Sequence, residues 1–446
     1  MSRIIVTLGQ LSVRRLRFDS TGPGPAGVGS WTSGLGNTVR RLFSRYLVLV
    51  GVLVNGLAAA FVLYWASDKV VGSELYRDGH RLVSGPLDGV EVTEVAAVAT
   101  GETNPGLRGL PVGTWIKIHE QASGSEEAFV RQAHGGAAFD PVRGRVMLFG
   151  SDTHSRDWDN SVRFFDMGTL SWSRVYPEDR PDTYRVSAGG FPVAGEGVER
   201  PWAMHTFDAV EFDEAADRLI VASHPKHMTP KKKWGVDKAL WNSIRSHPTW
   251  FYYVAEDRWE PMPGKAVSFF PNGGTFDPNR RAFIGVSADG YWELVADAMK
   301  WRRLGKGSPR AWHNSAAYDI DRDVVVSFGT NKRSNAIWQY RRGEKKGRKM
   351  PTPGLRPPGA ESPPLVYHPG IQRVVALVKR RKKNAPGSTE TWLYSTRDDV
   401  WSRMETATLP FDIGMNYDMV YDRRHELLVL VANMHREPTA VWVLRL

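Results

Sequence analysis

Short apolar runs recur along the last three quarters of the chain, and polar or turn-forming residues bound each of them. Each run has about six residues, which is short for a helix and typical of a buried strand. The runs are RVMLFG (145–150), RLIVAS (218–223), AFIGVS (282–287), VVVSFG (324–329), RVVALV (373–378) and LLVLVA (427–432). The pattern therefore predicts six similar units, each with one buried strand.

An aromatic residue followed by Asp or His stands a few residues before each apolar run. The intervening segments, such as DPVRG (140–144) and DPNRR (277–281), favour a hairpin turn, because an Asp side chain accepts hydrogen bonds from the turn that it opens. Each unit is thus expected to begin with a β-hairpin. The pairs are Phe139-Asp140, Phe212-Asp213, Phe276-Asp277, Tyr318-Asp319, Tyr367-His368 and Tyr421-Asp422.

Two further strands are expected in each unit. The third is rich in aromatic residues, as in WFYYV (250–254) and YWELV (291–295). The fourth begins with a Trp in four of the units. These residues are Trp172, Trp259, Trp301 and Trp401. The fourth unit has GRKM (347–350) at this place, and the sixth unit ends at Leu446 after its third strand.

The strand that the sixth unit lacks has a candidate in GTWIKIHE (113–120). If this strand pairs with the last unit, the ring of units closes and no long sheet edge is left exposed. A repeat of about 50 residues with four strands is typical of propellers. We therefore predict an all-β fold, a six-bladed β-propeller of four-stranded antiparallel blades, closed by an N-terminal strand at about 113–118.

The units resemble Kelch repeats of the galactose-oxidase-like type. The resemblance rests on the LFG and SFG segments (148–150 and 327–329), the Asn before the third strand (Asn160, Asn335) and the fourth-strand Trp. It covers about 113–446, but the Gly-Gly of the family is Gly-Ser at 150–151. It implies the propeller fold and identifies no subfamily.

One segment before the repeats, residues 46–67, carries no charge over 22 positions and predicts a membrane-spanning helix. Arginines dominate the tail before it, which favours a cytoplasmic N-terminus and an extracytoplasmic propeller. Export by a cleaved signal is the alternative. The expected organisation is a disordered basic tail (1–41), a transmembrane helix (42–67), a linker or stalk (68–112) and the propeller (113–446).

The composition of the chain excludes several classes of active site. The chain has 446 residues, a formal net charge of +11 and no Cys. Positive charge favours acidic partners, whereas the absence of Cys excludes thiol nucleophiles and Cys-ligated metals. It also excludes the copper-radical chemistry of galactose oxidase, whose cofactor needs a Cys cross-linked to a Tyr. No phosphate loop, HExxH motif or Ser-His-Asp elbow is found.

Long loops are expected on one face of the propeller, where the first strands begin, and long loops on a rigid scaffold are common binding sites. The largest are 176–204 and 224–249, and the second has a short helix expected within 235–246. Basic and aromatic residues in the second of these loops and in the loop 379–391 suit sugar rings, acidic glycans or nucleic-acid strands. The candidates are Lys231, Lys232, Lys233, Trp234, Trp241, Lys379, Arg380 and Arg381.

Polar residues just before the first strands are expected to surround the mouth of the central channel on this face. Such residues can hold a polar ligand, ordered water or a metal ion. The candidates are His134, His205, Asp208, Asn272, His313, Asn314 and Asn416. No cofactor is predicted, and a metal ion at the mouth is an alternative.

The favoured hypothesis is a membrane-anchored, extracytoplasmic binding module for an envelope glycan or a protein partner, without catalytic activity. A glycan-active enzyme that uses the His and Asp residues of the channel mouth is the first alternative. A binder of nucleic acid or of an anionic surface is the second, and it requires a cytoplasmic propeller.

Overall fold

The computed structural model of the protein describes residues 91–446 except for a few internal segments, and these residues belong to one compact unit, Leu82–Leu446. The internal segments left out are 123–133, 154–157, 233–234, 265–266, 296, 381–387, 416–417 and 433–438. The predicted basic tail and membrane helix therefore lie outside the described residues. Within the described part of the chain, no helix is long and apolar enough to span a bilayer.

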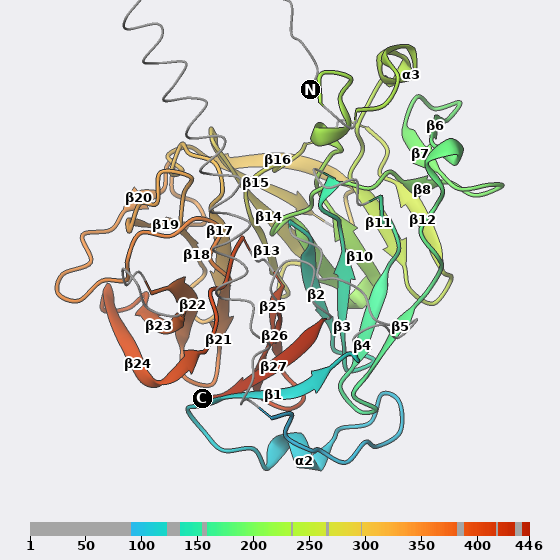
Figure 1. The fold of residues 1–446 in the computed structure, drawn as a ribbon. Coiled ribbons are helices and arrows are strands. Elements are labelled where there is room, and N and C mark those ends of the chain that lie inside the picture. The colour runs from blue at the N-terminus through green and yellow to red at the C-terminus, as the bar shows by residue number, and fades with distance from the viewer. Residues whose placement is uncertain are drawn as a thin grey trace, which may run out of the picture. The chain divides into compact units, whose positions relative to one another are not determined.

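Six four-stranded antiparallel sheets make up most of this unit (Figure 1). The first has β2 (Gly136–Asp140), β3 (Arg145–Phe149), β4 (Arg163–Asp166) and β5 (Ser171–Arg174). The second has β9 (Val210–Asp213), β10 (Arg218–Val221), β11 (Trp250–Tyr253) and β12 (Arg258–Pro261). The third has β13 (Gly274–Asp277), β14 (Ala282–Ser287), β15 (Gly290–Val295) and β16 (Lys300–Gly305).

The other three sheets repeat this order. The fourth has β17 (Ser315–Asp319), β18 (Val324–Phe328), β19 (Ile337–Arg341) and the short β20 (Arg348–Lys349). The fifth has β21 (Leu365–His368), β22 (Arg373–Lys379), β23 (Thr389–Ser395) and β24 (Val400–Leu409). The sixth combines β25 (Met419–Asp422), β26 (Leu427–Val431) and β27 (Ala440–Arg445) with β1 (Trp115–Glu120).

The first strands of the six sheets form a closed circle. Each of β2, β9, β13, β17 and β21 contacts the next one, and β25 contacts β2. At the outside of the last sheet, β1 pairs antiparallel with β27, with Trp115 opposite Leu444 and Glu120 opposite Ala440. The predicted pairing of the first strand with the last unit is therefore confirmed, and the fold is propeller-like and all-β.

The fourth-strand Trp residues lie between neighbouring sheets, each against the sheet that precedes its own in the circle. The Trp301 indole donates to Thr249 Oγ1 at 2.9 Å, and the Trp259 indole donates to Tyr176 Oη at 2.6 Å. Trp115 donates in the same way to Thr391 Oγ1 at 2.9 Å. Burying a large aromatic side chain contributes roughly 2–3 kcal/mol. The repeated Trp is therefore a packing residue that holds the sheets together.

The Asp residues that end the first strands are fully buried, and four of them, Asp140, Asp277, Asp319 and Asp422, accept hydrogen bonds from turn N–H groups, as predicted; Asp213 instead pairs with Arg218 and Arg281. Asp277 accepts from the N–H groups of Asn279 and Arg280, at 3.1 and 3.2 Å. Its second oxygen pairs with the Arg280 guanidinium at 2.8 Å, and Arg280 also reaches Asp323 of the next sheet at 2.7 Å. We call this side of the circle, which carries the short hairpin turns, the turn face.

A linker or stalk was expected over 68–112; residues 68–90 of it lie outside the described residues, and residues 91–112 pack against the turn face and β1. The segment EVTEVAAVAT forms no strand; the N–H of Val98 donates to Gly168 at 2.9 Å, and a short helix, α2 (Pro105–Arg108), follows. Asn104 caps α2 and its own N–H donates to His425 Nε2 at 2.8 Å. Leu107 is fully buried among residues of the first and sixth sheets. Burial of this apolar side chain stabilises the packing of the segment against the sheets.

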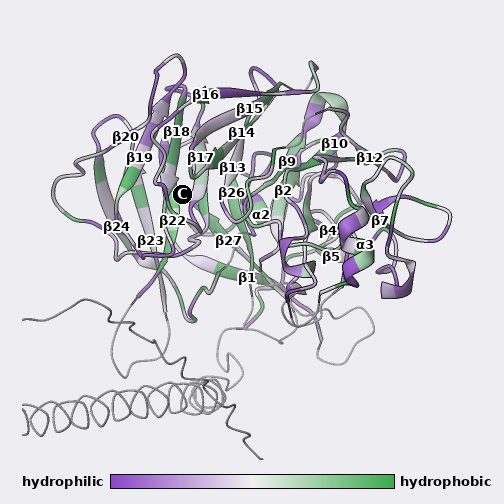
Figure 2. Ribbon diagram, turned by 90° about the horizontal axis from the view of Figure 1, so that it is seen from above, coloured by the Kyte–Doolittle hydropathy of each residue, from purple (hydrophilic) through white to green (hydrophobic). Residues whose placement is uncertain are grey.

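The two long insertions pack together on the opposite side, which we call the loop face. The first contains β6 (Arg185–Val186), β7 (Pro192–Ala194) and β8 (Arg200–Pro201), which form a three-stranded sheet, and the second contains the expected helix, α3 (Lys238–Ser243). Trp202 and Met228 are buried in a small core that the two insertions share. Figure 2 shows hydrophobic residues concentrated in the strands of the large sheets, whereas hydrophilic residues are frequent in the connecting loops.

Short 3-10 helices complete the described secondary structure. They are η2 (Pro181–Thr183), η3 (Glu214–Ala216) and η4 (Lys226–Met228).

Candidate functional site: the channel mouth and the loop face

A central cavity of about 380 Å³ runs between the six first strands, each of which contributes to its wall. Small side chains such as Ala138 and Ala316 line it, as the sequence indicated for the innermost strands. Two carboxyl groups, Asp208 and Glu211, also face this cavity. Burial raises the pKa of both well above its usual range, and the charge of Asp208 raises the pKa of Glu211 further.

At the loop face, the residues six positions before the aromatic–Asp pairs share an uncommon backbone conformation. His134, Phe207 and His313 have φ angles of 67°, 51° and 62°, in the left-handed region. Their backbones are tied together: the Phe207 N–H donates to the His134 carbonyl at 3.0 Å, and the Ser362 N–H donates to the His313 carbonyl at 3.0 Å. The mouth is thus built from strained corners that the surrounding hydrogen bonds hold in place.

The predicted mouth residues form two groups instead of one ring. His134 and His205 lie side by side with ring centroids 4.5 Å apart. In the other group, Asn314 donates to Asn272 Oδ1 at 2.9 Å, in a buried contact.

Two further mouth candidates have local partners, and one cannot be placed. Asp208 accepts the N–H of Ala316 at 2.8 Å. His313 lies 3.4 Å from Ser362 Oγ, and burial lowers its pKa to about 4. Asn416 lies outside the described residues.

Asp152 joins the first group; from the sequence it was one of several carboxylates that could converge on this face, but it was not among the predicted mouth residues. Its Oδ1 is 3.7 Å from His205 Nε2 and 4.0 Å from His134 Nε2. The three donor atoms lie within 4.8 Å of one another, which is a spacing that can accommodate a metal ion. Asp152 follows the second strand by three positions, and its place at the start of a long loop was the only signal in the sequence.

More histidines surround this group. His227 stacks on His205 with ring centroids 4.3 Å apart, and Phe207 contacts both His205 and His134. Burial is the main cause that lowers the pKa of His224 to about 3, and His224 contacts Ser268 Oγ at 2.5 Å. Burial also lowers the pKa of His247 to about 4. His224 and His247 are therefore neutral at physiological pH and can act as hydrogen-bond acceptors.

The predicted basic and aromatic loop residues do not form one patch. Lys231 and Lys232 are exposed, whereas Trp241 packs on the small core of the insertions, so its ring is not an open stacking surface. Lys379 pairs with Asp412, and Arg380 is 3.5 Å from Glu390. The remaining three candidates, Lys233, Trp234 and Arg381, lie outside the described residues.

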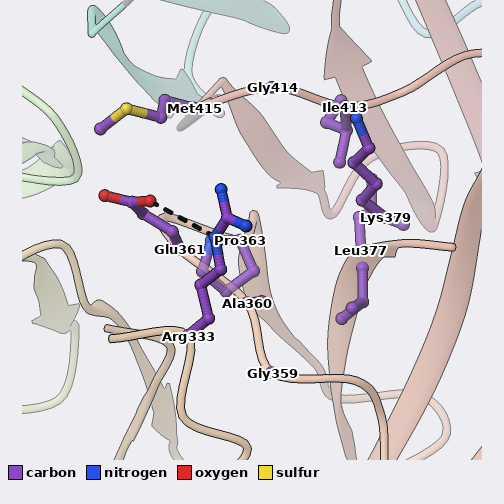
Figure 3. A pocket seen from close by; sticks show the side chains of 11 residues that line it. Arg333, Gly359, Ala360, Glu361, Pro363, Leu377, Lys379, Ile413, Gly414 and Met415 are labelled. Carbon is purple, nitrogen blue, oxygen red and sulfur yellow. Dashed lines mark ion pairs between the residues drawn. The ribbon is translucent and has the colours of Figure 1, made fainter. Parts of the chain in front are cut away.

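A separate pocket of about 250 Å³ opens among loops of the fourth, fifth and sixth sheets (Figure 3). Arg333 and Glu361 extend into it from one wall, and Lys379 and Leu377 lie on the other, with Ile413 close by. The Arg333 guanidinium and the Glu361 carboxylate are 3.9 Å apart, an ion pair without close contact. The pocket therefore combines two cations and one carboxylate with an apolar wall.

Comparisons with known proteins identify no family for this chain. No protein-family model matches the chain, and no curated protein matches it. Among the solved structures that are similar is TolB from Acinetobacter baumannii, with 7% identity and a TM-score of 0.40. The match covers 69% of this chain and 62% of the TolB chain. A likeness at this level supports no conclusion about function.

Proposed function

We propose that this protein is a binding module built on a six-bladed, Kelch-type β-propeller that a membrane helix at 42–67 anchors outside the cytoplasm. We further propose that its loop face binds an acidic polysaccharide of the cell envelope. The apolar segment 46–67 and the arginines before it support the anchor and its orientation. The net charge of +11 supports an acidic ligand.

The observation that carries the ligand class is the pocket with Arg333 and Lys379. Their side chains are 59% and 53% exposed, so both cations can reach a ligand. Leu377 and Ile413 supply an apolar surface for one face of a sugar ring. At about 250 Å³ the pocket is smaller than most sites for drug-sized ligands, which suits one charged unit of a longer chain.

Binding of oligogalacturonate to the full chain in detergent micelles tests the ligand, with a neutral malto-oligosaccharide of equal length as the comparison. We expect saturable binding of the acidic sugar only, and weaker binding as salt rises. Arg333→Ala should weaken it roughly tenfold, because a charge-assisted hydrogen bond is lost. Arg258→Ala is the matched control, since Arg258 is a half-exposed, ion-paired Arg on β12.

Equal binding of both sugars, binding of neither, or an equal loss in both Arg variants would contradict the proposal. A protein partner would then be the next hypothesis. The location has its own test: a periplasmic-type reporter enzyme fused after Leu446 should be active and a cytoplasmic one inactive. The reverse result would favour the nucleic-acid alternative.

A further inference from the structure

The histidines and the aspartate at the channel mouth have a chemistry that the acidic-glycan proposal does not use. His134 precedes the first sheet, Asp152 follows β3, and His205 precedes the second sheet. His205 is 1% exposed and Asp152 is 8% exposed. Two imidazoles and a carboxylate that converge in a nearly dry site are the donor set that first-row transition metals prefer.

We propose that His134, Asp152 and His205 bind one divalent transition-metal ion of the Zn²⁺ class. The donors around a Zn²⁺ ion lie roughly 3–3.6 Å apart, given bond lengths of about 2.0–2.2 Å. The observed separations from Asp152 Oδ1, 3.7 and 4.0 Å, need a closure of a few tenths of an ångström, and the two imidazole donors, which lie within 4.8 Å of each other, need a closure of at most about 1.5 Å. Side-chain torsions alone can supply a movement of that size.

The backbone around the three ligands is fixed before any metal arrives. The His134 carbonyl accepts hydrogen bonds from the N–H groups of Thr206 and Phe207, both at 3.0 Å. The His205 carbonyl accepts from Ser223 Oγ at 2.5 Å. The N–H of Ser151, the residue before Asp152, donates to Met204 at 2.9 Å. These bonds cross-link the three ligand segments, which lowers the entropic cost of ordering a metal site.

Stacking fixes the imidazole rings as well. His134 and His205 are inclined by only 30°, and the His227 ring stacks on His205. Phe207 contacts both ligand rings and closes the apolar side of the site.

Three protein ligands leave at least one coordination position for water or for an oxygen of a bound molecule. Nitrogen donors disfavour Mg²⁺ and Ca²⁺, which prefer oxygen ligands. The site is independent of the acidic-glycan proposal, because different sheets form it and the Arg333 pocket contributes none of its ligands.

Metal titration of the full chain tests the proposal. The protein is purified in detergent with a tag that contains no His, stripped with EDTA and titrated with Zn²⁺ by calorimetry. We expect one Zn²⁺ per chain, no competition from Ca²⁺, and d–d bands of nitrogen- and oxygen-ligated Co²⁺ when Co²⁺ is used instead. His205→Ala and Asp152→Asn should each weaken binding by at least about 100-fold.

His313→Ala is the matched control, because His313 is a partly buried His of the same mouth that lies with Ser362 outside the proposed ligand set. Its affinity for Zn²⁺ should equal that of the parent. Asp152→Asn keeps the size of the side chain. The thermal melt of the metal-free variant is measured as well, so that unfolding is not mistaken for loss of a metal ligand. Absence of saturable Zn²⁺ binding would overturn the proposal. So would full affinity in folded Asp152→Asn, or an equal loss in His313→Ala.

Discussion

The two faces of the ring of sheets are built in opposite ways. On the turn face, several short hairpins share one arrangement, in which a buried Asp holds the turn and an Arg reaches the neighbouring sheet, as Asp140 with Arg143 and Asp277 with Arg280 do. On the loop face, long insertions differ from sheet to sheet and carry strained corners such as His134 and His313. The same strands support both faces. The face with repeated hairpins therefore has a structural role, and the face with loops that differ from sheet to sheet is available for binding.

The energetics of the two faces differ accordingly. On the turn face, charges are buried in satisfied pairs, and the segment 91–112 adds Asn104 and the buried Leu107. The loop face holds neutral histidines, a small separate core and the Arg333 pocket. Changes on the turn face are therefore expected to alter global stability, and changes on the loop face to alter binding. Three experiments test this contrast.

Deletion of residues 113–119 should have the largest effect. It removes most of β1, exposes the edge of β27 and uncovers the core around Trp442. We expect the full chain to become insoluble or to lose its cooperative melt, because an open edge and an unsealed core both favour aggregation. Ile116→Val keeps the strand and should melt like the parent. A deletion variant as stable as the parent would refute the closure of the ring.

Asp277→Ala should come next. The Asp277 carboxylate is fully buried, accepts two turn N–H groups and pairs with Arg280. Its loss leaves those donors unsatisfied and should lower the free energy of unfolding by about 3 kcal/mol. Urea denaturation measures the change.

Asp237→Ala is the matched variant on the loop face. Asp237 is an exposed N-cap that accepts the N–H groups of Ala239 and Leu240 at the start of α3. Its removal should affect α3 locally and cost clearly less global stability than Asp277→Ala. Equal losses in the two variants would contradict the contrast between the faces.

Glu211→Gln should give a smaller, pH-dependent effect inside the channel. Burial, reinforced by Asp208, raises the pKa of Glu211 above its usual 4.5 in the folded protein. Between that value and the raised pKa, the folded state binds more protons than the unfolded state, so stability falls as pH rises. The variant removes this loss and should be more stable than the parent at pH 7, with the difference shrinking toward pH 4.5.

Denaturation at several pH values between 5 and 8 measures the slope for parent and variant. Glu293→Gln is an informative contrast, because Glu293 is a buried carboxylate paired with Arg302 and Arg342, and its loss should destabilise the protein at neutral pH. The prediction is wrong if the stability of the parent and that of Glu211→Gln change with pH at the same slope. Glu211 would then ionise in the folded protein without a loss of stability.

The sequence by itself determined the strands, their order in each sheet and the closure by Trp115. These features depend on local signals: a buried strand needs an apolar run, a hairpin needs an Asp at its turn, and a repeat places equivalent residues in equivalent positions. Trp301 and Trp401 could thus be assigned to outer strands without coordinates. The sequence did not predict the packing of residues 91–112. Their apolar residues follow no regular spacing that would distinguish a stalk from a segment packed on the sheets.

Only the tertiary structure decided which side chains meet. His134 and His313 occupy equivalent positions in the repeat, yet one lies with Asp152 and His205 and the other with Ser362. Similarly, Trp241 is partly buried against the small core that the two insertions share. Such contacts depend on how long loops of unrelated sequence fold over a shared rim. No repeat encodes them, because their energy comes from partners that the local sequence does not contain.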